Sequence, residues 1–315
     1  MADKRRTLPD GTAIAMLHGA VMLFGLSGVI GRFVESSAIM TAWGRVLVSS
    51  ALLLGYLTIN KTPLALKSPR DTLRAMAGGA LLAVHWTAFF QSVQMASVAI
   101  GTITFSTFPL FLIFLEPVIF REKFQKKNLA SVAVILLGVI ITIPEYSLSN
   151  TVTVGILWGM ISSLIYALLA LINRDLSSKY RGIQISFYEQ ATAGVVLLPL
   201  MLFTYKTPSV TDILGIAGIG IFCTAIGFSL YVTAQKSVSA QQAGIVSSME
   251  TVYGILFAAI LLREAPTPRE LIGGAIILAV AVFASVQSGG SPRSDSTDAT
   301  DPTDPTEGPG KTQRQ

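Results

Sequence analysis

Two long apolar stretches most constrain what this chain can fold into, one from Thr102 to Glu122 and one from Gly244 to Glu264. Each holds about 20 residues, enough to cross a hydrocarbon layer of roughly 30 Å as a single helix. Both end in the dipeptide Arg-Glu, followed by a short polar step and another apolar, glycine-containing run. The chain therefore contains a membrane-spanning unit that occurs twice.

The composition agrees with this interpretation. Apolar residues make up 51 % of the chain and charged residues only 13 %, and the charges lie between the apolar runs, as in a polytopic membrane protein. The net charge of +5 comes from short loops beside these runs, so it favours a role in orientation over nucleic-acid binding. The single cysteine, Cys223, excludes a disulfide within the chain, and we expect no cofactor and no metal site.

The apolar pattern predicts an all-α integral membrane protein with ten transmembrane helices. The predicted runs are 13–30, 39–59, 73–94, 99–120, 129–143, 154–172, 185–205, 213–234, 242–262 and 271–286. They divide the chain into an N-terminus (1–12), a first five-helix unit (13–143), a second five-helix unit (152–287) and a tail (288–315). The tail is rich in Ser, Thr, Asp, Pro and Gly, which is typical of disorder.

Lysine and arginine indicate the orientation. With the N-terminus in the cytoplasm, the predicted inner segments carry 15 basic residues and the outer loops only four, namely Arg32, Lys206, Arg263 and Arg269. We therefore expect a multi-pass protein of the inner (cytoplasmic) membrane with both termini in the cytoplasm.

The repeat predicts more than the number of helices. A shift of 142 positions places Arg121-Glu122 on Arg263-Glu264, Ser106 on Ser248 and Phe108 on Glu250. Because five is an odd number, the second unit enters the membrane from the opposite side, which makes an inverted repeat. Many secondary transporters have this arrangement and bind their substrate near the midplane between the repeats.

With these features the chain resembles the drug/metabolite transporter superfamily, in its EamA branch of ten-helix carriers. The resemblance rests on the two five-helix halves, the two Arg-Glu ends and the glycine-bearing fifth and tenth helices, and it covers residues 13–287. It implies alternating access around a central cavity lined mainly by helices one, three, four, six, eight and nine, and export of amino acids or other small metabolites. Aromatic amino acid exporters of this superfamily line the cavity with Trp, Tyr and His. Comparable residues here are His18, His85, Trp86 and Trp158.

Glu250 is the strongest candidate for substrate contact. It falls near the middle of the ninth predicted helix, on a stripe with Ser247 and Gly254 at helical spacing. A charged group at this depth costs at least about 2.5–3.5 kcal/mol, so it needs a partner or a role. A carboxylate there suits a substrate ammonium or a proton, and the alternative is a structural pair with an arginine.

The remaining candidates are polar and aromatic residues within predicted spans. His85 has Trp86 beside it and Phe89 one turn away, so this part of helix three offers a hydrogen-bonding group and aromatic walls. Both histidines, His18 and His85, also fit simple packing roles. Pro109 predicts a kink, where the hydroxyls of Thr102, Ser106 and Thr107 bond freed backbone groups or face the cavity. Tyr231 is expected to line the cavity from helix eight or to pack against lipid.

Arg45 and Glu189 occupy nearly equivalent places in helices two and seven. They are candidates for a structural ion pair across the pseudo-symmetric interface, and either one is an alternative substrate contact.

The sequence thus predicts a secondary transporter of the cytoplasmic membrane, most simply an exporter of amino acids or related amphipathic amines. The runner-up is an importer or exchanger of nucleotide sugars or organic phosphates, for which Arg45 is thin support because anionic cargo favours several basic residues. Outside the carrier class, a channel lacks a continuous polar pore, and a membrane-embedded enzyme lacks a catalytic motif. Proton coupling and downhill exchange stay open, as do a monomer and a homodimer.

Overall fold

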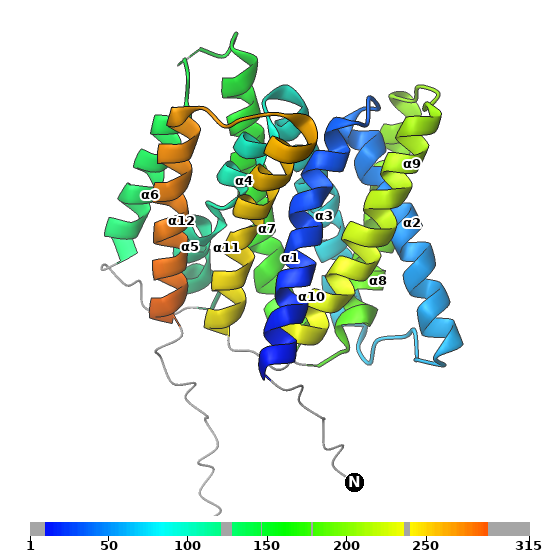
Figure 1. Cartoon of the computed structure of the whole chain (residues 1–315). Helices are drawn as coiled ribbons and strands as arrows, with labels where there is room; N and C mark the ends of the chain where they lie inside the picture. Colours follow the sequence, from blue (N-terminus) through cyan, green and yellow to red (C-terminus); the bar gives the residue numbers. More distant parts are fainter. Residues whose placement is uncertain (1–9, 121–127, 146, 178, 236–239, 289–315) are drawn as a thin grey trace, which may run out of the picture.

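The computed structural model describes residues 10–120, 128–145, 147–177, 179–235 and 240–288, and these ranges contain helices and no β-strand (Figure 1). The helices are α1 (Asp10–Arg32), α2 (Ala38–Ile59), α3 (Pro69–Met95), α4 (Val98–Phe105), α5 (Phe108–Phe120), α6 (Asn128–Thr142), α7 (Thr151–Ser177), α8 (Gly182–Phe203), α9 (Val210–Gly218), η1 (Ile219–Ile226), α10 (Gly227–Gln235), α11 (Ala240–Phe257), η2 (Ala258–Leu262) and α12 (Pro268–Ser288). The segments η1 and η2 are π-helical. The Arg121-Glu122 dipeptide and nearly all of the predicted tail lie outside the described residues.

The helices are apolar on their outer faces as well as between one another. Seven helical segments are long and apolar enough to cross a membrane, namely Gly11–Arg32, Ala38–Ile59, Pro69–Met95, Val98–Ile119, Thr151–Asn173, Gly182–Phe203 and Val210–Tyr231. Two shorter apolar helical segments are Val132–Thr142 and Met249–Leu262. Large apolar side chains such as Val195, Leu202, Ile213 and Leu271 are exposed on the surface of the bundle. This surface is suited to lipid, and the protein is an integral membrane protein.

The described chain enters and leaves the bundle on the same face. In Figure 1, α1 begins and α12 ends at the bottom, and we call this side the termini face and the opposite side the far face. The links 60–68 and 179–181 lie at the termini face, while the links 33–37 and 204–209 and the described residues 143–145 and 147–150 lie at the far face.

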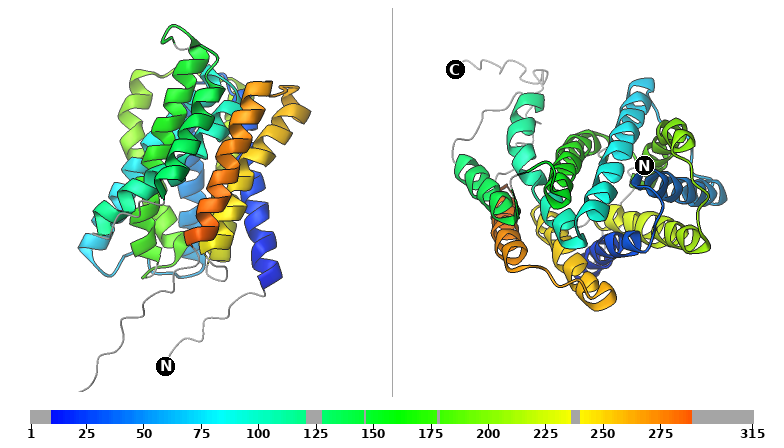
Figure 2. Two further views of the ribbon diagram at one scale, coloured as in Figure 1. Left: turned by 90° about the vertical axis from the view of Figure 1, so that its left-hand side faces the viewer. Right: turned by 90° about the horizontal axis from the view of Figure 1, so that it is seen from above.

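The main packing contacts join helices that are distant in sequence. α3 packs on α7 and α8, α1 packs on α11 and on the α9–η1–α10 segment, and α2 packs on α8. α6 and α12 lie side by side at one edge of the bundle (Figures 1 and 2). The two halves of the sequence are therefore interleaved, and neither half forms a separate bundle.

Glycine allows α1 and α11 to approach closely. A methyl group at Gly25 of α1 would lie 2.8 Å from the backbone nitrogen of Gly254 and 3.0 Å from the carbonyl oxygen of Glu250, both on α11. Small residues permit such contact between helices in lipid, where apolar burial adds little to association. Gly25 thereby fixes the position of the helix segment that carries Glu250.

The predicted helix 99–120 is divided by a break between α4 and α5 at Ser106 and Thr107. Pro109 has no N–H, so the carbonyl group of Phe105 cannot receive its helical hydrogen bond. The hydroxyl of Ser163 on α7 donates to this carbonyl oxygen at 3.1 Å. The kink predicted at Pro109 is present in the described chain, but the hydrogen bond to the freed carbonyl comes from a neighbouring helix.

The α9–η1–α10 segment is interrupted in a different way. Its middle is π-helical, and the Thr224 hydroxyl donates to the carbonyl oxygen of Ile219 at 2.9 Å within this part. π-Helical segments inside longer helices are rare and frequently lie at functional sites. This one places Thr224 against Arg45 of α2, as described below.

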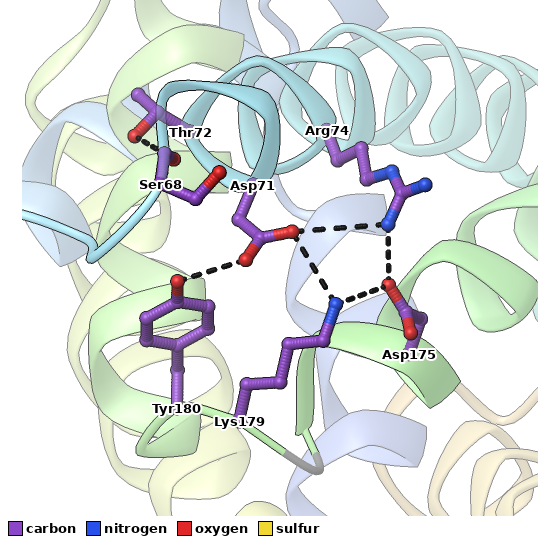
Figure 3. Close-up of polar contacts among 7 residues, drawn as sticks. All are labelled: Ser68, Asp71, Thr72, Arg74, Asp175, Lys179 and Tyr180. Atoms are coloured by element: carbon purple, nitrogen blue, oxygen red, sulfur yellow. Dashed lines mark hydrogen bonds and ion pairs between the residues drawn. The ribbon is translucent and has the colours of Figure 1, made fainter.

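Charged residues tie α3 to the end of α7 at the termini face (Figure 3). Asp71 accepts a hydrogen bond from the Tyr180 hydroxyl at 2.9 Å and forms an ion pair with Lys179 at 3.4 Å. Asp175 pairs with Arg74 at 2.6 Å and with Lys179 at 3.0 Å. The Asp175 carboxylate beside it is the main cause of the raised pKa of Lys179, so the lysine stays charged at neutral pH.

A similar contact lies at the far face, 141 positions later in the sequence. Asp212, near the start of α9, accepts hydrogen bonds from the backbone N–H of Glu35 at 2.7 Å and the Ser36 hydroxyl at 3.0 Å. Asp71 near the start of α3 binds the link after α7, and Asp212 near the start of α9 binds the link after α1. The two aspartates thus have equivalent positions at opposite faces of the bundle.

The Arg-Glu end of the second half closes part of the far face. Glu264 accepts hydrogen bonds from Arg32 at 2.8 and 3.0 Å, and Arg32 also donates to the carbonyl oxygens of Val93 and Gln94, each at 3.4 Å. Arg263 has a left-handed backbone with φ of 58°, which ends η2 and turns Glu264 toward α1. Arg32 thereby joins α1 to α3 and to the residues directly after η2.

We expect Gly25→Ala to lower the thermal stability of the purified protein, because the added methyl group meets backbone atoms that cannot move aside. Alanine normally stabilises a helix relative to glycine by about 0.5–1 kcal/mol, so the sign of the effect is diagnostic. The matched control is Gly55→Ala, where no heavy atom lies within 4 Å of the new methyl group. Thermal unfolding in detergent should show a loss for the first variant and no loss for the second, and equal melting temperatures would contradict the close approach.

We also expect Asp71→Asn to lower the melting temperature by a few degrees, because the amide cannot pair with Lys179 and accepts poorly from Tyr180. Arg74→Gln is the control, since Arg74 is half-exposed and exposed ion pairs contribute about 0–1 kcal/mol. Unfolding followed by fluorescence measures both. A larger loss for Arg74→Gln than for Asp71→Asn would contradict the importance of the buried carboxylate.

Candidate functional site

A narrow cavity lies between the two halves of the chain, among α1, α4, α5, α7, α10 and α11. Its lining residues are Phe24, Phe105, Ser106, Phe108, Tyr166, Tyr231, Ser247 and Glu250. Its volume of about 20 Å³ has room for one water-sized molecule. The walls are close together in this conformation, so a larger molecule can bind only if the helices separate.

Six of the eight lining residues form pairs separated by 142 positions in the sequence. The pairs are Phe24 with Tyr166, Phe105 with Ser247 and Phe108 with Glu250. In every pair the first half of the chain supplies phenylalanine and the second half supplies a hydroxyl or carboxyl group. At these paired positions the first half of the chain therefore supplies apolar groups and the second half supplies polar groups, while Ser106 adds one hydroxyl from the first half.

The aromatic side is a set of rings in contact. Phe105 packs against Phe108 with ring centroids 5.8 Å apart and against Tyr166 at 4.9 Å, and Phe108 lies 5.4 Å from Tyr166. Phe24 packs against Tyr231 at 5.7 Å. Rings at these distances attract one another and offer flat apolar surface to a ligand.

Hydroxyl groups hold the polar side in place. The Tyr231 hydroxyl lies 3.0 Å from the Ser247 hydroxyl, which joins α10 to α11. Ser106, at the break between α4 and α5, lies 2.5 Å from the hydroxyl of Thr251, which donates to the carbonyl oxygen of Thr102 at 3.1 Å. The broken helix is thus fastened to the helix that carries Glu250.

Arg45 does not pair with Glu189, so the predicted ion pair is absent from the described contacts. Its Nε donates to Thr224 at 3.0 Å and its Nη1 donates to Ser27 at 3.3 Å. The guanidinium group lies over the ring of Trp86, 3.9 Å from its centre. Arg45 and Glu189 are each the eighth residue of their helix. The two side chains nevertheless face different neighbours.

The carboxylate that interacts electrostatically with Arg45 is Glu250. Arg45 itself is 4 % exposed and does not line the cavity. Its charge therefore acts on Glu250 from behind the cavity wall, while its hydrogen bonds and the Trp86 ring compensate for its burial.

His85 stands behind the aromatic wall. It is 5 % exposed, and its Nδ1 lies 2.8 Å from the Ser162 hydroxyl and 3.0 Å from the Ser162 carbonyl oxygen. Its ring contacts Tyr166 and Phe105, with centroids 5.1 and 5.3 Å away. Phe89 also contacts Phe105, at 6.2 Å. In this conformation these residues support the lining and are not part of it.

Some of the other candidates line the cavity and some lie outside its lining. Ser106, Tyr231 and Glu250 line it. His18 is bonded to the Tyr253 hydroxyl at 2.8 Å, which joins α1 to α11 outside the lining. Trp158 is half-buried on α7 and does not line the cavity.

Sequence reasoning did not select five of the lining residues. They are Phe24, Phe105, Phe108, Tyr166 and Ser247. The local sequence around an aromatic residue in an apolar helix does not indicate whether its side chain lines a cavity, faces lipid or packs in the core. The usable signal was the repeat, because the shift of 142 positions that places Phe108 on Glu250 also places Phe24 on Tyr166 and Phe105 on Ser247.

Comparison with known families agrees with this twofold organisation. The sequence profile described as the EamA-like transporter family matches two segments of the chain, residues 11–143 and 153–286. The chain belongs to the EamA-like transporter family. Its helices, its apolar surface and the resemblance found in the sequence all fit this membership.

Relatives over nearly the whole chain are named as transporters. An uncharacterized transporter of Archaeoglobus fulgidus is 28 % identical over 89 % of this chain and 97 % of its own length. The pseudopaline exporter CntI of Pseudomonas aeruginosa is 24 % identical over 88 % of this chain and 96 % of its own length. One solved crystal structure shares the fold, with a TM-score of 0.62 and 15 % identity over 90 % of this chain and 99 % of the other.

We expect His85→Ala to destabilise the protein by about 1–3 kcal/mol, because it removes the buried imidazole contact with Ser162 and the ring behind Phe105 and Tyr166. The Ser162 hydroxyl keeps its bond to the backbone carbonyl oxygen of residue 85. His18→Ala is the control, since His18 is half-buried and its bond to Tyr253 is partly exposed. Chemical unfolding of both variants measures the difference. A larger loss for His18→Ala would contradict the supporting role of His85.

Proposed function

We propose that this transporter is a secondary carrier that exports small amphipathic amines, amino acids first, across the cytoplasmic membrane by alternating access. One observation carries the proposal, namely that the cavity between the two halves combines an aromatic wall with a single carboxylate, Glu250. Phenylalanine and tyrosine rings suit the apolar part of such a molecule and attract a cation at their faces. Glu250 suits its ammonium group.

Alternating access requires two states related by the repeats, and the packing supports an inverted arrangement of ten crossing segments. Taking α4–α5, α9–η1–α10 and α11–η2 as one segment each gives five segments in each half. A shift of five segments relates the contact of α3 with α7 to that of α9–η1–α10 with α1. It also relates the contact of α1 with α11 to that of α7 with α4 and α5. The aspartates at opposite faces, Asp71 and Asp212, follow the same rule.

The charge distribution supports an orientation with both termini in the cytoplasm. Basic residues gather in the links that lie on the same side as the termini, such as 60–68 and 179–181, while the opposite links carry few. This is the distribution that the positive-inside rule associates with cytoplasmic loops. The far face is then the outer face, and the contact of Arg32 with Glu264 closes part of it.

Export is the direction we favour because a relative that aligns over most of the chain is named as an exporter. The alternative, transport of organic phosphates or nucleotide sugars, has weaker support. No basic side chain lines the described cavity, and Arg45 is occupied by Thr224, Ser27 and Trp86. A cavity of this size gives a channel no continuous path, and an enzymatic role has no support from the lining residues. One chain contains both repeats, so a monomer completes the cavity.

Ligand-induced thermal stabilisation tests the proposal. We expect phenylethylamine, phenylalanine and tryptophan to raise the melting temperature of the detergent-purified protein, and sugar phosphates to leave it unchanged. A ligand at 100 times its dissociation constant adds about 2.7 kcal/mol of stability. Glu250→Gln should weaken amine binding roughly ten- to a hundredfold, the loss expected for a charged hydrogen bond.

Glu35→Gln is the control for this experiment, because Glu35 is an exposed glutamate in the far-face link. Stabilisation by phosphorylated compounds alone would overturn the choice of cargo. Full amine binding by Glu250→Gln would remove Glu250 from the site while leaving the carrier fold intact.

A further inference from the structure

Outside the cavity, a second polar group lies inside the membrane-spanning part of the bundle and has no role in the proposed site. Glu189 on α8 is 1 % exposed, and within the described part of the chain neither of its carboxylate oxygens makes a hydrogen bond of regular geometry. The neutral amide of Asn173 is the donor that comes near it. As the eighth residue of a helix that begins at the termini face, it lies about 10 Å inside that end. Glu189 is therefore a buried carboxylate in the half of the bundle next to the termini face.

Other unpartnered side-chain oxygens lie on the same and neighbouring helices. Ser186 and Gln190 are on α8, three residues before and one residue after Glu189, and Asn173 approaches Glu189 from α7. Ser49 on α2 lies one turn from Val46, which faces Gly194 of α8. These four side-chain oxygens are buried and, within the described part of the chain, have no hydrogen-bond partner.

The backbone of α3 makes room for the carboxylate. A methyl group at Gly78 would lie 2.9 Å from Glu189 Oε1, so any larger residue there would collide with it. The adjacent Gly79 packs directly against the Glu189 carbonyl oxygen. The carboxyl group is thus enclosed on the α3 side and screened from lipid.

No cationic group described on the surrounding helices neutralises Glu189. The helices that pack against α8 carry the titratable side chains Arg45 on α2, His85 on α3, Tyr166 on α7 and Tyr231 on α10, and α8 itself carries Tyr188. Arg45 and His85 bond to other residues, and the charged residues of Figure 3 pair with one another at the helix ends. Among the described contacts, none of these groups is hydrogen-bonded or ion-paired to Glu189.

An ionised carboxylate in this position would cost several kcal/mol, because it is buried away from bulk solvent and has no counter-charge among the described residues. Adding one proton forms an O–H bond, removes the charge and creates a donor on the helix face that Ser186 shares and that Asn173 approaches, where both side-chain oxygens lack a partner. We propose that Glu189 is the centre of a proton-binding site in the termini-side half of the carrier. It holds its proton while the bundle is closed and exchanges it with water when the termini face opens.

This inference rests on the transporter assignment and extends it to a coupling ion. The site adjoins the cavity through α7, which contacts α8 and carries Tyr166 of the cavity lining. Glu189 is then the group through which a proton gradient acts on the helices around the cargo. The ligand class is a single proton.

Infrared difference spectroscopy of the full-length purified protein tests the proposal without any cargo. At pH 7 we expect the wild type to show the C=O stretching band of a protonated carboxylic acid. Glu189→Gln should remove this band component, Glu189→Asp should shift it, and Glu250→Gln should retain it. Because Gln is neutral and of the same shape as a protonated Glu, Glu189→Gln should also unfold within a few degrees of the wild type.

Three results would overturn the proposal. They are a band that Glu189→Gln leaves unchanged, a wild type with no such band, and a band that disappears when sodium chloride is added at constant pH, which would assign the site to sodium. If Glu189→Gln does not fold, the shift in Glu189→Asp decides the question. Since no cargo is present, a negative result here is distinguishable from failure of the amine-export proposal.

Discussion

A hydrocarbon layer offers no hydrogen bonds, so every polar group in this bundle must find its partner inside the protein. The rule decides where helices can be interrupted. α4 and α5 break at Ser106 and Thr107 because Pro109 frees the Phe105 carbonyl group, and Ser163 of α7 replaces the missing donor. Thr251 holds Ser106 and the Thr102 carbonyl oxygen from the other side. The break that shapes the cavity wall is stable only because two neighbouring helices bond to it.

The same rule distinguishes Arg45 from Glu189, the two ionisable residues that occupy equivalent places in the repeats. Arg45 receives two hydroxyl partners and an aromatic ring, so its charge is tolerated where it lies. Glu189 has no cation partner among the described residues, and the donor that reaches it is the neutral amide of Asn173. Equivalent positions of the two repeats therefore carry side chains of different chemistry. Such a difference between the halves can give transport a direction.

The cavity shows the same asymmetry on a smaller scale. Equivalent positions of the two halves meet there, yet the first half supplies phenylalanine where the second supplies Tyr166, Ser247 and Glu250. A symmetric pore could not distinguish the two ends of a molecule. This cavity combines apolar rings with hydroxyl and carboxyl groups, which suits a molecule that has an apolar and a polar end. Its walls are close together in this conformation, so its volume does not define the size of the substrate.

The sequence by itself determined that the chain crosses a membrane repeatedly, that its two halves are related and that it belongs among transporters. These properties follow from the length and composition of each apolar run and from the spacing of the repeat, which need no knowledge of neighbours. Only the tertiary structure decided which polar residues meet. Arg45 faces Trp86 and Thr224 instead of Glu189, and His85 supports the wall that Phe105 and Tyr166 form. Helices that are apolar on nearly all sides carry little record of their rotation, because in lipid the packing of small residues and the pairing of scarce polar groups fix it.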